Sequence, residues 1–171
     1  MQKVEIKYYN FFFIHKFTNY KTILKIYSEF IIKYYLLKID PVRDLLFDSK
    51  KAVSFEGDTG PYLQYTYARA NSILSKAKEE GNADSLDENG IGIVKKLSMF
   101  PEIIEKCASE LKPNYLANYL SELALLFNEF YHNQQVIGSE DEEALLAMVL
   151  AVKTVMGNGL QLLGITPLEK M

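Results

Sequence analysis

The sequence predicts an all-α protein, a helical bundle, and three observations support that prediction. Apolar residues recur at steps of three and four along several segments, whereas apolar and polar residues alternate for only a few positions at a time. Proline, glycine and polar clusters divide the chain into pieces of helical length. Hydrophobic residues make up 49% of the 171 residues and charged residues 24%, a composition typical of about one folded globular domain.

Helical periodicity between these breakers predicts helices over residues 20–38, 61–79, 92–98, 101–111, 113–132 and 140–163. Pro41 ends the first of them, because a proline pushes the residue before it out of the helical region. Pro61 opens the second at a position where its missing N–H is not needed. Residues 43–55 form a connector between the two, which Phe47 and Phe55 are expected to anchor to the core.

The second half of the chain carries its own boundary signals. Residues 81–90, GNADSLDENG, hold two glycines and no β-branched residue, so they are expected to form a surface loop. Ser139, with Glu142 three positions on, matches a capping box at the start of the last helix. Gly164 is expected to end that helix. Together the predicted helices form one bundle.

Composition limits the classes of function. Cys107 is the only cysteine and has no histidine near it in the sequence, so it is interpreted as a core residue in a reducing compartment, with the cytoplasm as the expected location. A net charge of −3 argues against a surface that coats nucleic acid, although a focused site is compatible with it. The apolar run Phe11–Ile14 is too short to span a membrane.

The run FEGDTGPYLQYTYAR, from Phe55 to Arg69, is the most informative stretch of the chain. Tyr62, Tyr65 and Arg69 follow one another at i, i+3 and i+7, so one helix face carries two phenol rings and a guanidinium. Unpaired bases stack on such groups. The alternative is packing, since tyrosines often bury one ring face and keep the hydroxyl wet. Arg69 is expected either to bind phosphate or to brace the bundle against carboxylates, with bracing preferred, and Tyr67, which points away from this face, is expected to pack.

Two further runs accompany it, PNYLANYLSELALLFNEFY over residues 113–131 and the closing NGLQLLGITPLEKM. With GDTGPYLQY, and in this order, they resemble the C-terminal anticodon-binding domain, of the DALR type, of arginyl-tRNA synthetases. The resemblance covers about residues 31–171 and implies an all-α anticodon-binding domain there. Residues 1–30 are interpreted as an out-of-family leader, or alternatively as a segment that covers exposed apolar surface.

The resemblance also implies a set of RNA-binding residues. They are Tyr62, Tyr65, Arg69, Tyr131, Gln135 and Met171. The tyrosines lie where the family places tyrosines near the anticodon loop, and Met171 where its terminal methionine lies close to a base. Some members have an aromatic residue at the position of Gln135, so stacking there is not implied. Asn118 is interpreted as a polar surface residue. Three lysines are expected to be solvated, namely Lys95, Lys96 and Lys153.

No catalytic or metal-binding residue is expected in this chain. A class I synthetase activates its amino acid with an HIGH-like loop and a KMSKS-like loop, and neither motif occurs in the sequence. The chain is therefore expected to need no cofactor, and ATP is expected only for a catalytic domain that is absent from it. Alone, it is not expected to be catalytic, although the resemblance makes it part of an arginine–tRNA ligase.

The resemblance implies arginine tRNA as the partner, with a separate or missing catalytic domain as a second one. A homo-oligomer is a further option, and neither a membrane nor DNA is expected. The rival interpretation is a detached helical module, derived from a synthetase, that binds another protein. Exposed tyrosines beside the C-terminus favour RNA, whereas a broad exposed patch of leucine, isoleucine and phenylalanine favours protein.

Overall fold

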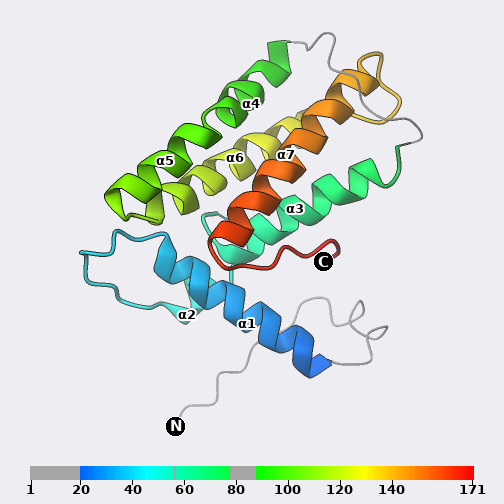
Figure 1. The fold of residues 1–171 in the computed structure, drawn as a ribbon. Coiled ribbons are helices and arrows are strands. Elements are labelled where there is room, and N and C mark those ends of the chain that lie inside the picture. Colours follow the sequence, from blue (N-terminus) through cyan, green and yellow to red (C-terminus); the bar gives the residue numbers. More distant parts are fainter. Residues whose placement is uncertain (1–19, 56, 78–87) are drawn as a thin grey trace.

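The computed structural model describes residues 20–55, 57–77 and 88–171, and in these ranges every regular element is a helix. The helices are α1 (Tyr20–Leu37), α2 (Ser49–Ala52), α3 (Gly60–Leu74), α4 (Glu88–Ser98), α5 (Phe100–Glu110), α6 (Asn114–Asn133) and α7 (Glu142–Leu162) (Figure 1). The predicted all-α bundle is confirmed.

Helices α3, α6 and α7 form the centre of the bundle and contact one another (Figure 1). α4 and α5 follow one another along one side, where α4 packs on α6 and α7 and α5 packs on α6. α1 lies against α3 and α6, and the C-terminal segment runs back alongside α3. The N-terminal end of α3 is therefore enclosed by α1, α6 and the end of the chain.

The core is built from apolar faces that these helices share. Leu120, Phe127, Val149 and Met156 are fully buried, and they come from α6 and α7. α7 is long and apolar enough to cross a membrane by length and composition alone, and 44% of that window is buried inside the bundle. Because α7 packs against α3, α4 and α6, the fold itself accounts for its apolar character.

Two helices differ from their predicted bounds, and one was not predicted. α3 ends at Leu74 instead of Glu79, and α4 begins at Glu88, inside the predicted loop 81–90. The rest of that loop lies outside the described residues. The short α2 forms in the connector because the Asp48 side chain accepts hydrogen bonds from the N–H groups of Lys50 and Lys51.

Of the two expectations for the ends of α7, the one for its start was wrong and the one for its end is confirmed. The capping box does not form: Asp141 holds the N-cap position of α7, Ser139 donates to the carbonyl of Val136, and the Glu142 carboxylate accepts from the N–H of Gly138. Gly164 does end the helix, with a positive φ of 69°.

Phe47 and Phe55 do not anchor the connector in the core, because they are 46% and 57% exposed. Phe47 instead packs its ring edge-on against Tyr35 of α1, with the centroids 4.8 Å apart. The connector therefore carries apolar side chains on its outer side.

The boundary predicted between residues 30 and 31 falls inside α1, which continues without interruption from Tyr20 to Leu37. Phe30 and Tyr34 both belong to the core. In the described structure the last part of the predicted leader is thus an integral part of the bundle. Residues 1–19, for which a leader role was predicted, lie outside the described residues.

Candidate functional site

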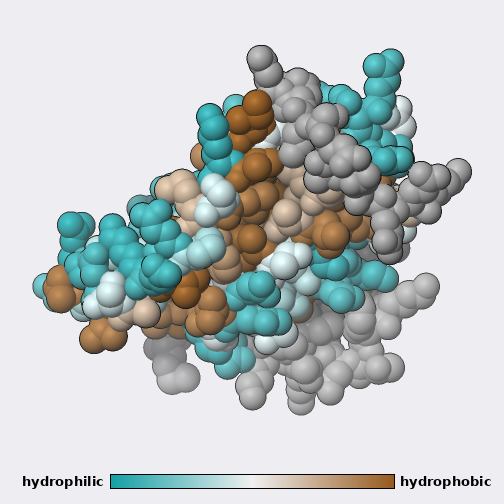
Figure 2. Space-filling view, turned by 45° about the horizontal axis from the view of Figure 1, so that its top comes forward, coloured by the Kyte–Doolittle hydropathy of each residue, from teal (hydrophilic) through white to brown (hydrophobic). Residues whose placement is uncertain are grey.

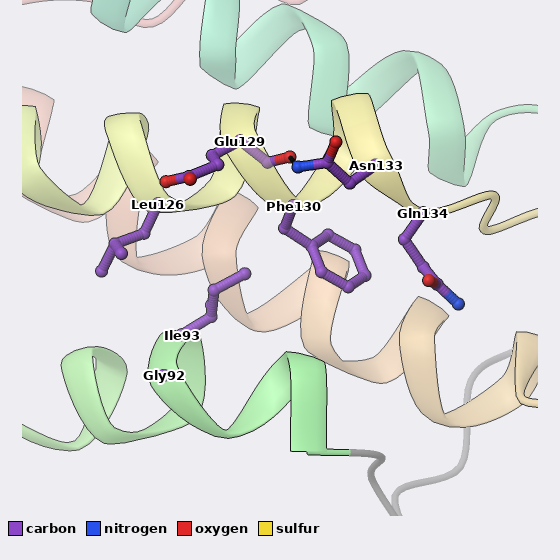
Figure 3. A pocket seen from close by; sticks show the side chains of 7 residues that line it. All are labelled: Gly92, Ile93, Leu126, Glu129, Phe130, Asn133 and Gln134. Carbon is purple, nitrogen blue, oxygen red and sulfur yellow. Dashed lines mark hydrogen bonds between the residues drawn. The ribbon is translucent and has the colours of Figure 1, made fainter.

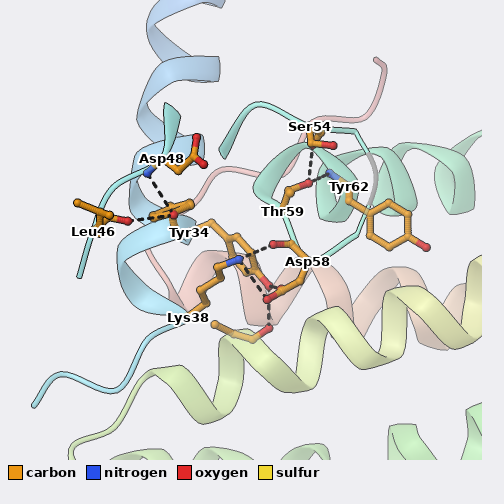
Figure 4. Close-up of polar contacts among 10 residues, drawn as sticks. Tyr34, Lys38, Leu46, Asp48, Ser54, Asp58, Thr59 and Tyr62 are labelled. Carbon is orange, nitrogen blue, oxygen red and sulfur yellow. Dashed lines mark hydrogen bonds and ion pairs between the residues drawn. The ribbon is translucent and has the colours of Figure 1, made fainter. Parts of the chain in front are cut away.

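The first turn of α3 is defined by its sequence. Gly57 takes a positive φ of 78°, which glycine adopts without strain, and the Thr59 side chain caps the helix by accepting from the N–H of Tyr62 at 3.3 Å. Pro61 stands in the first turn, as predicted. The Thr59 hydroxyl also donates to the carbonyl of Ser54 at 2.6 Å (Figure 4).

Asp58 ties this turn to the end of α1. Its carboxylate accepts from the hydroxyl of Tyr34 and lies 3.2 Å from Lys38 Nζ, which also donates to the Asp58 carbonyl at 2.6 Å (Figure 4). The Tyr34 hydroxyl also lies 3.3 Å from the carbonyl of Ala117 in α6. Burial, followed by the nearby Asp58 charge, raises the pKa of Tyr34 well above its ordinary value. One tyrosine thus joins α1, the turn and α6.

One turn further on, α3 and α6 bring three of the predicted residues together. The Arg69 guanidinium carbon lies 4.4 Å from the ring centroid of Tyr65 and 4.8 Å from that of Tyr131. Arg69 Nη2 also donates to the Tyr65 hydroxyl. Both rings remain accessible, at 41% and 38% exposure. We call these three residues the aromatic–arginine cluster.

Asn128 of α6 holds this cluster in place. Its Oδ1 accepts from Arg69 Nη1 at 2.7 Å, and its Nδ2 donates to Thr66 Oγ1 at 2.7 Å. Arg69 was expected to brace the bundle against carboxylates; it does join α3 to α6, but through the amide of Asn128 and the ring of Tyr131. Sequence reasoning did not single out Asn128, although it stands three residues before Tyr131 and so on the same side of α6.

The other predicted residues make no such contacts with the cluster, although Tyr62 stands three residues before Tyr65 and so on the same side of α3. Tyr62 is half-buried and packs against the core. Gln135 Nε2 donates to the carbonyl of Ile137 at 2.8 Å, which shapes the turn that leads to α7. Among the described residues, no hydrogen bond or ring contact joins the side chains of Tyr62, Gln135 or Met171 to the cluster.

The C-terminal segment follows a different side of α3. Gln64, which is fully buried, donates to the carbonyl of Thr166 and accepts from the N–H of Leu168, both at 2.8 Å. Asn71 donates to the carbonyl of Glu169 at 3.0 Å. Residues two positions apart lie about 200° apart around a helix, so Asn71 projects away from the side that carries Arg69. The chain leading to Met171 is thus anchored away from the cluster.

A hollow that sequence reasoning missed lies between α4 and α6, away from the predicted residues (Figure 3). It has a volume of about 360 Å³ and a mixed lining, in which Ile93, Leu126 and Phe130 are apolar and Glu129, Asn133 and Gln134 are polar (Figure 3). The absence of a side chain at Gly92, around which a Cβ atom would meet nothing within 4 Å, helps to open it. The described residues hold no group of three or more His, Cys, Asp and Glu side chains that could bind a metal ion.

Some expectations for individual side chains are confirmed and others are not. Tyr67 packs, as predicted: a Cβ atom at Gly157 would lie 3.1 Å from its ring. Cys107 is half-buried against the core, and burial raises the pKa of its thiol. Lys96 is not simply solvated, because its ammonium pairs with Glu122 and lies 5.1 Å from the ring centroid of Tyr119.

Comparisons with known proteins all lead to arginyl-tRNA synthetases and to their anticodon-binding domain. Residues 63–171 match the family described as the DALR anticodon binding domain. The arginine–tRNA ligase of Methanoregula boonei is 43% identical over 143 residues, which cover 82% of this chain and 26% of that protein. The corresponding protein of Thermococcus kodakarensis is 40% identical over 154 residues, covering 82% of this chain and 24% of that protein.

Among solved structures, an arginyl-tRNA synthetase of Thermus thermophilus superposes with a TM-score of 0.84 at 32% identity, covering 92% of this chain and 29% of that one. That match leaves 8% of the 171 residues uncovered, about 14 residues, so it extends into the segment 1–30. The chain spans about a quarter of the length of the curated relatives that it matches.

Proposed function

Because the chain belongs to the DALR anticodon-binding domain family, we propose that it binds the anticodon loop of an arginine-accepting tRNA. The observation that carries this proposal is the aromatic–arginine cluster, in which two exposed phenol rings flank a guanidinium. Unpaired loop bases are recognised by stacking on aromatic rings and on arginine planes, and the cluster offers both on one surface.

Two kinds of group in the cluster can contact RNA: the N–H donors of Arg69 and the exposed faces of the two tyrosine rings. Arg69 has five N–H donors, and in the described structure two of them have partners, Asn128 and the Tyr65 hydroxyl. The others are available to a phosphate or to the edge of a base. A base stacked on Tyr65 or Tyr131 contributes ~1–3 kcal/mol. With a net charge of −3 on the chain, we expect moderate affinity that falls as the salt concentration rises.

The proposal assigns binding, and no bond-forming step, to this chain. Aminoacylation, and the ATP that it consumes, would depend on the catalytic domain of a synthetase, and we propose no residue of this chain for either. In an intact synthetase, the energy of anticodon binding would position the acceptor end of the tRNA in that domain. Such a role in translation fits a cytoplasmic protein. Arginine-dependent exchange of pyrophosphate into ATP by the purified chain would contradict this part of the proposal.

The direct test compares two single substitutions. Tyr131→Ala removes one exposed ring of the cluster and should weaken binding to an arginine tRNA transcript by roughly 5- to 150-fold, the equivalent of one lost stack. Lys95→Ala is the matched surface control, because Lys95 is exposed; Lys96 does not serve, since it packs on Tyr119. Equal affinities of wild type and Tyr131→Ala, measured by filter binding, would refute the proposal.

A second candidate function is supported by a different surface. The connector and the outer side of α1 expose large apolar side chains, which are Ile32, Leu36, Val42, Leu46, Phe47, Val53 and Phe55. Val42 and Leu46 are 85% and 91% exposed. Figure 2 shows that hydrophobic residues also reach the surface of the described molecule in a band between hydrophilic ones. Apolar surface of this kind favours a protein contact.

The occupant that we propose for this surface is the part of an arginyl-tRNA synthetase that the chain does not span. The test mixes the chain with the remaining three quarters of the Methanoregula boonei enzyme and measures association by sedimentation velocity. Leu46→Glu should abolish association, whereas Leu125→Glu, on the exposed side of α6, should not. Failure to associate, or self-association of the chain through Leu46, would exclude this occupant.

A further inference from the structure

The side-chain amide of Asn128 is constrained by hydrogen bonds to two neighbours in α3. It is half-buried in α6, and both ends of its amide are used across the α3–α6 contact. The assignment of the two amide ends follows from the partners, since a guanidinium only donates and therefore requires Oδ1. Thr66, which receives the Nδ2 hydrogen bond, is fully buried and donates its own hydroxyl to the carbonyl of Tyr62 at 2.9 Å. Asn128 is thus fixed from the core side.

Arg69, in contrast, has few other constraints. Its remaining described contacts are with Tyr65 and Tyr131, whose rings are themselves partly exposed. An arginine side chain that is free to move loses up to ~2 kcal/mol of rotamer entropy when it is ordered. The hydrogen bond from Asn128 restricts that freedom in the unbound protein, so less of it has to be lost on binding.

We infer that Asn128 is a positioning residue for RNA binding: it holds Arg69 between the two tyrosine rings and thereby preorganises the surface on which a base stacks. The inference rests on the proposed anticodon binding and deepens it. Asn128 does not have to contact RNA, because it acts through the guanidinium. Its effect on affinity should therefore disappear when Arg69 is absent.

The test is a double-mutant cycle measured with an arginine tRNA transcript. Asn128→Ala should weaken binding by about 2- to 10-fold, the cost of ordering one long side chain on binding. In an Arg69→Met background the same substitution should cause no further loss. Asn118→Ala is the matched control, since Asn118 is an exposed asparagine of the same helix. All affinities are measured below the unfolding transition of every variant.

Two results would overturn the inference: an unchanged affinity for Asn128→Ala, or an equal loss in both backgrounds. A purely structural asparagine would give the second result, since its effect would not depend on the guanidinium. If Asn128→Ala does not fold, Asn128→Ser is measured in the same cycle and interpreted in the same way. Tyr131→Ala distinguishes failure of the proposed anticodon binding from failure of the role inferred for Asn128. If it binds as tightly as wild type, anticodon binding by the cluster fails; if it binds weakly while Asn128→Ala does not, only the role of Asn128 fails.

Discussion

Replacing Gly159 with alanine should destabilise the protein, although glycine is a poor residue in the middle of a helix. Gly159 lies in α7, and a Cβ atom built there would lie 2.6 Å and 2.9 Å from the two methyl carbons of Leu120 and 3.2 Å from its Cγ. Carbon atoms in contact prefer a separation of about 3.5–4.0 Å, so either the Leu120 side chain or one of the two helices has to move. Leu120 is fully buried, which leaves it little room.

The magnitude follows from two opposing contributions. Exchanging glycine for alanine in a helix interior is worth about 1 kcal/mol of stability. Overpacking a close-packed core costs about 1–3 kcal/mol. Gly92 isolates the first contribution, because it is exposed in α4 and a Cβ atom there meets nothing within 4 Å. Gly92→Ala should therefore stabilise the protein, and Gly159→Ala should lie about 1–3 kcal/mol below it.

Urea denaturation followed by far-ultraviolet circular dichroism measures both variants against the wild type. Truncating the Leu120 side chain should remove the destabilising effect of Gly159→Ala on the free energy of unfolding. In a Leu120→Ala background, which has its own cost of about 2–5 kcal/mol, Gly159→Ala should become neutral or stabilising. If Gly159→Ala stabilises the wild-type protein as much as Gly92→Ala does, the close approach of α6 and α7 has no energetic weight and the reasoning is refuted.

Three other outcomes follow from the structure. Burial and a neighbouring carboxylate raise the pKa of Tyr34, and burial raises that of Tyr119 to about 12, whereas the unperturbed pKa is 10.0. Above pH 10 the unfolded state therefore loses these protons first. The stability that is present below that pH should then fall by up to about 1.4 kcal/mol per pH unit for each group. Urea titration of Tyr34→Phe should show a shallower fall than the wild type, and an equally steep fall would contradict this. Gln64→Leu should cost about 1–3 kcal/mol and speed proteolytic trimming of the C-terminal segment, detected by mass spectrometry, because it leaves two backbone groups unpaired. Lys96→Ala should lower the unfolding midpoint modestly, with a change below about 1 kcal/mol, while Lys95→Ala leaves it unchanged; the reverse order would be inconsistent with the contacts of Lys96.

The helices that the sequence predicted well are those whose signals are local. α1 and α6 carry apolar residues at helical spacing over four or more turns, and α5 is opened by a proline. α2 was missed because one turn is too short to show a period, and it depends on a single cap from Asp48. The exposure of Phe55 was not predictable either, since an aromatic residue in a connector gives no indication of which side it faces.

The candidate site shows the same division. The sequence predicted that Tyr65 and Arg69 share a helix face, and their i+4 spacing allows the contact that they make within α3. The pairing of Arg69 with Asn128 spans 59 positions and exists only because α3 crosses α6 at this point. Met171 was placed by resemblance alone, and the segment that leads to it follows the hydrogen-bonding groups of Gln64 and Asn71 instead.

The position of the cluster on α3 has a physical reason. α3 is held at its first turn through Asp58, along its inner side by Asn128, and along a third side by the chain terminus at Gln64 and Asn71. A helix fixed on three sides has little freedom to rotate or shift, so a side chain on its remaining exposed side keeps its place. Stacking gains most when the ring is already in place, because ordering costs are then met by folding and not by binding. Substitutions that loosen the attachment at Asp58, or the one at Gln64 and Asn71, should therefore weaken binding less than removal of Tyr131, and in proportion to how far they let α3 move relative to α6.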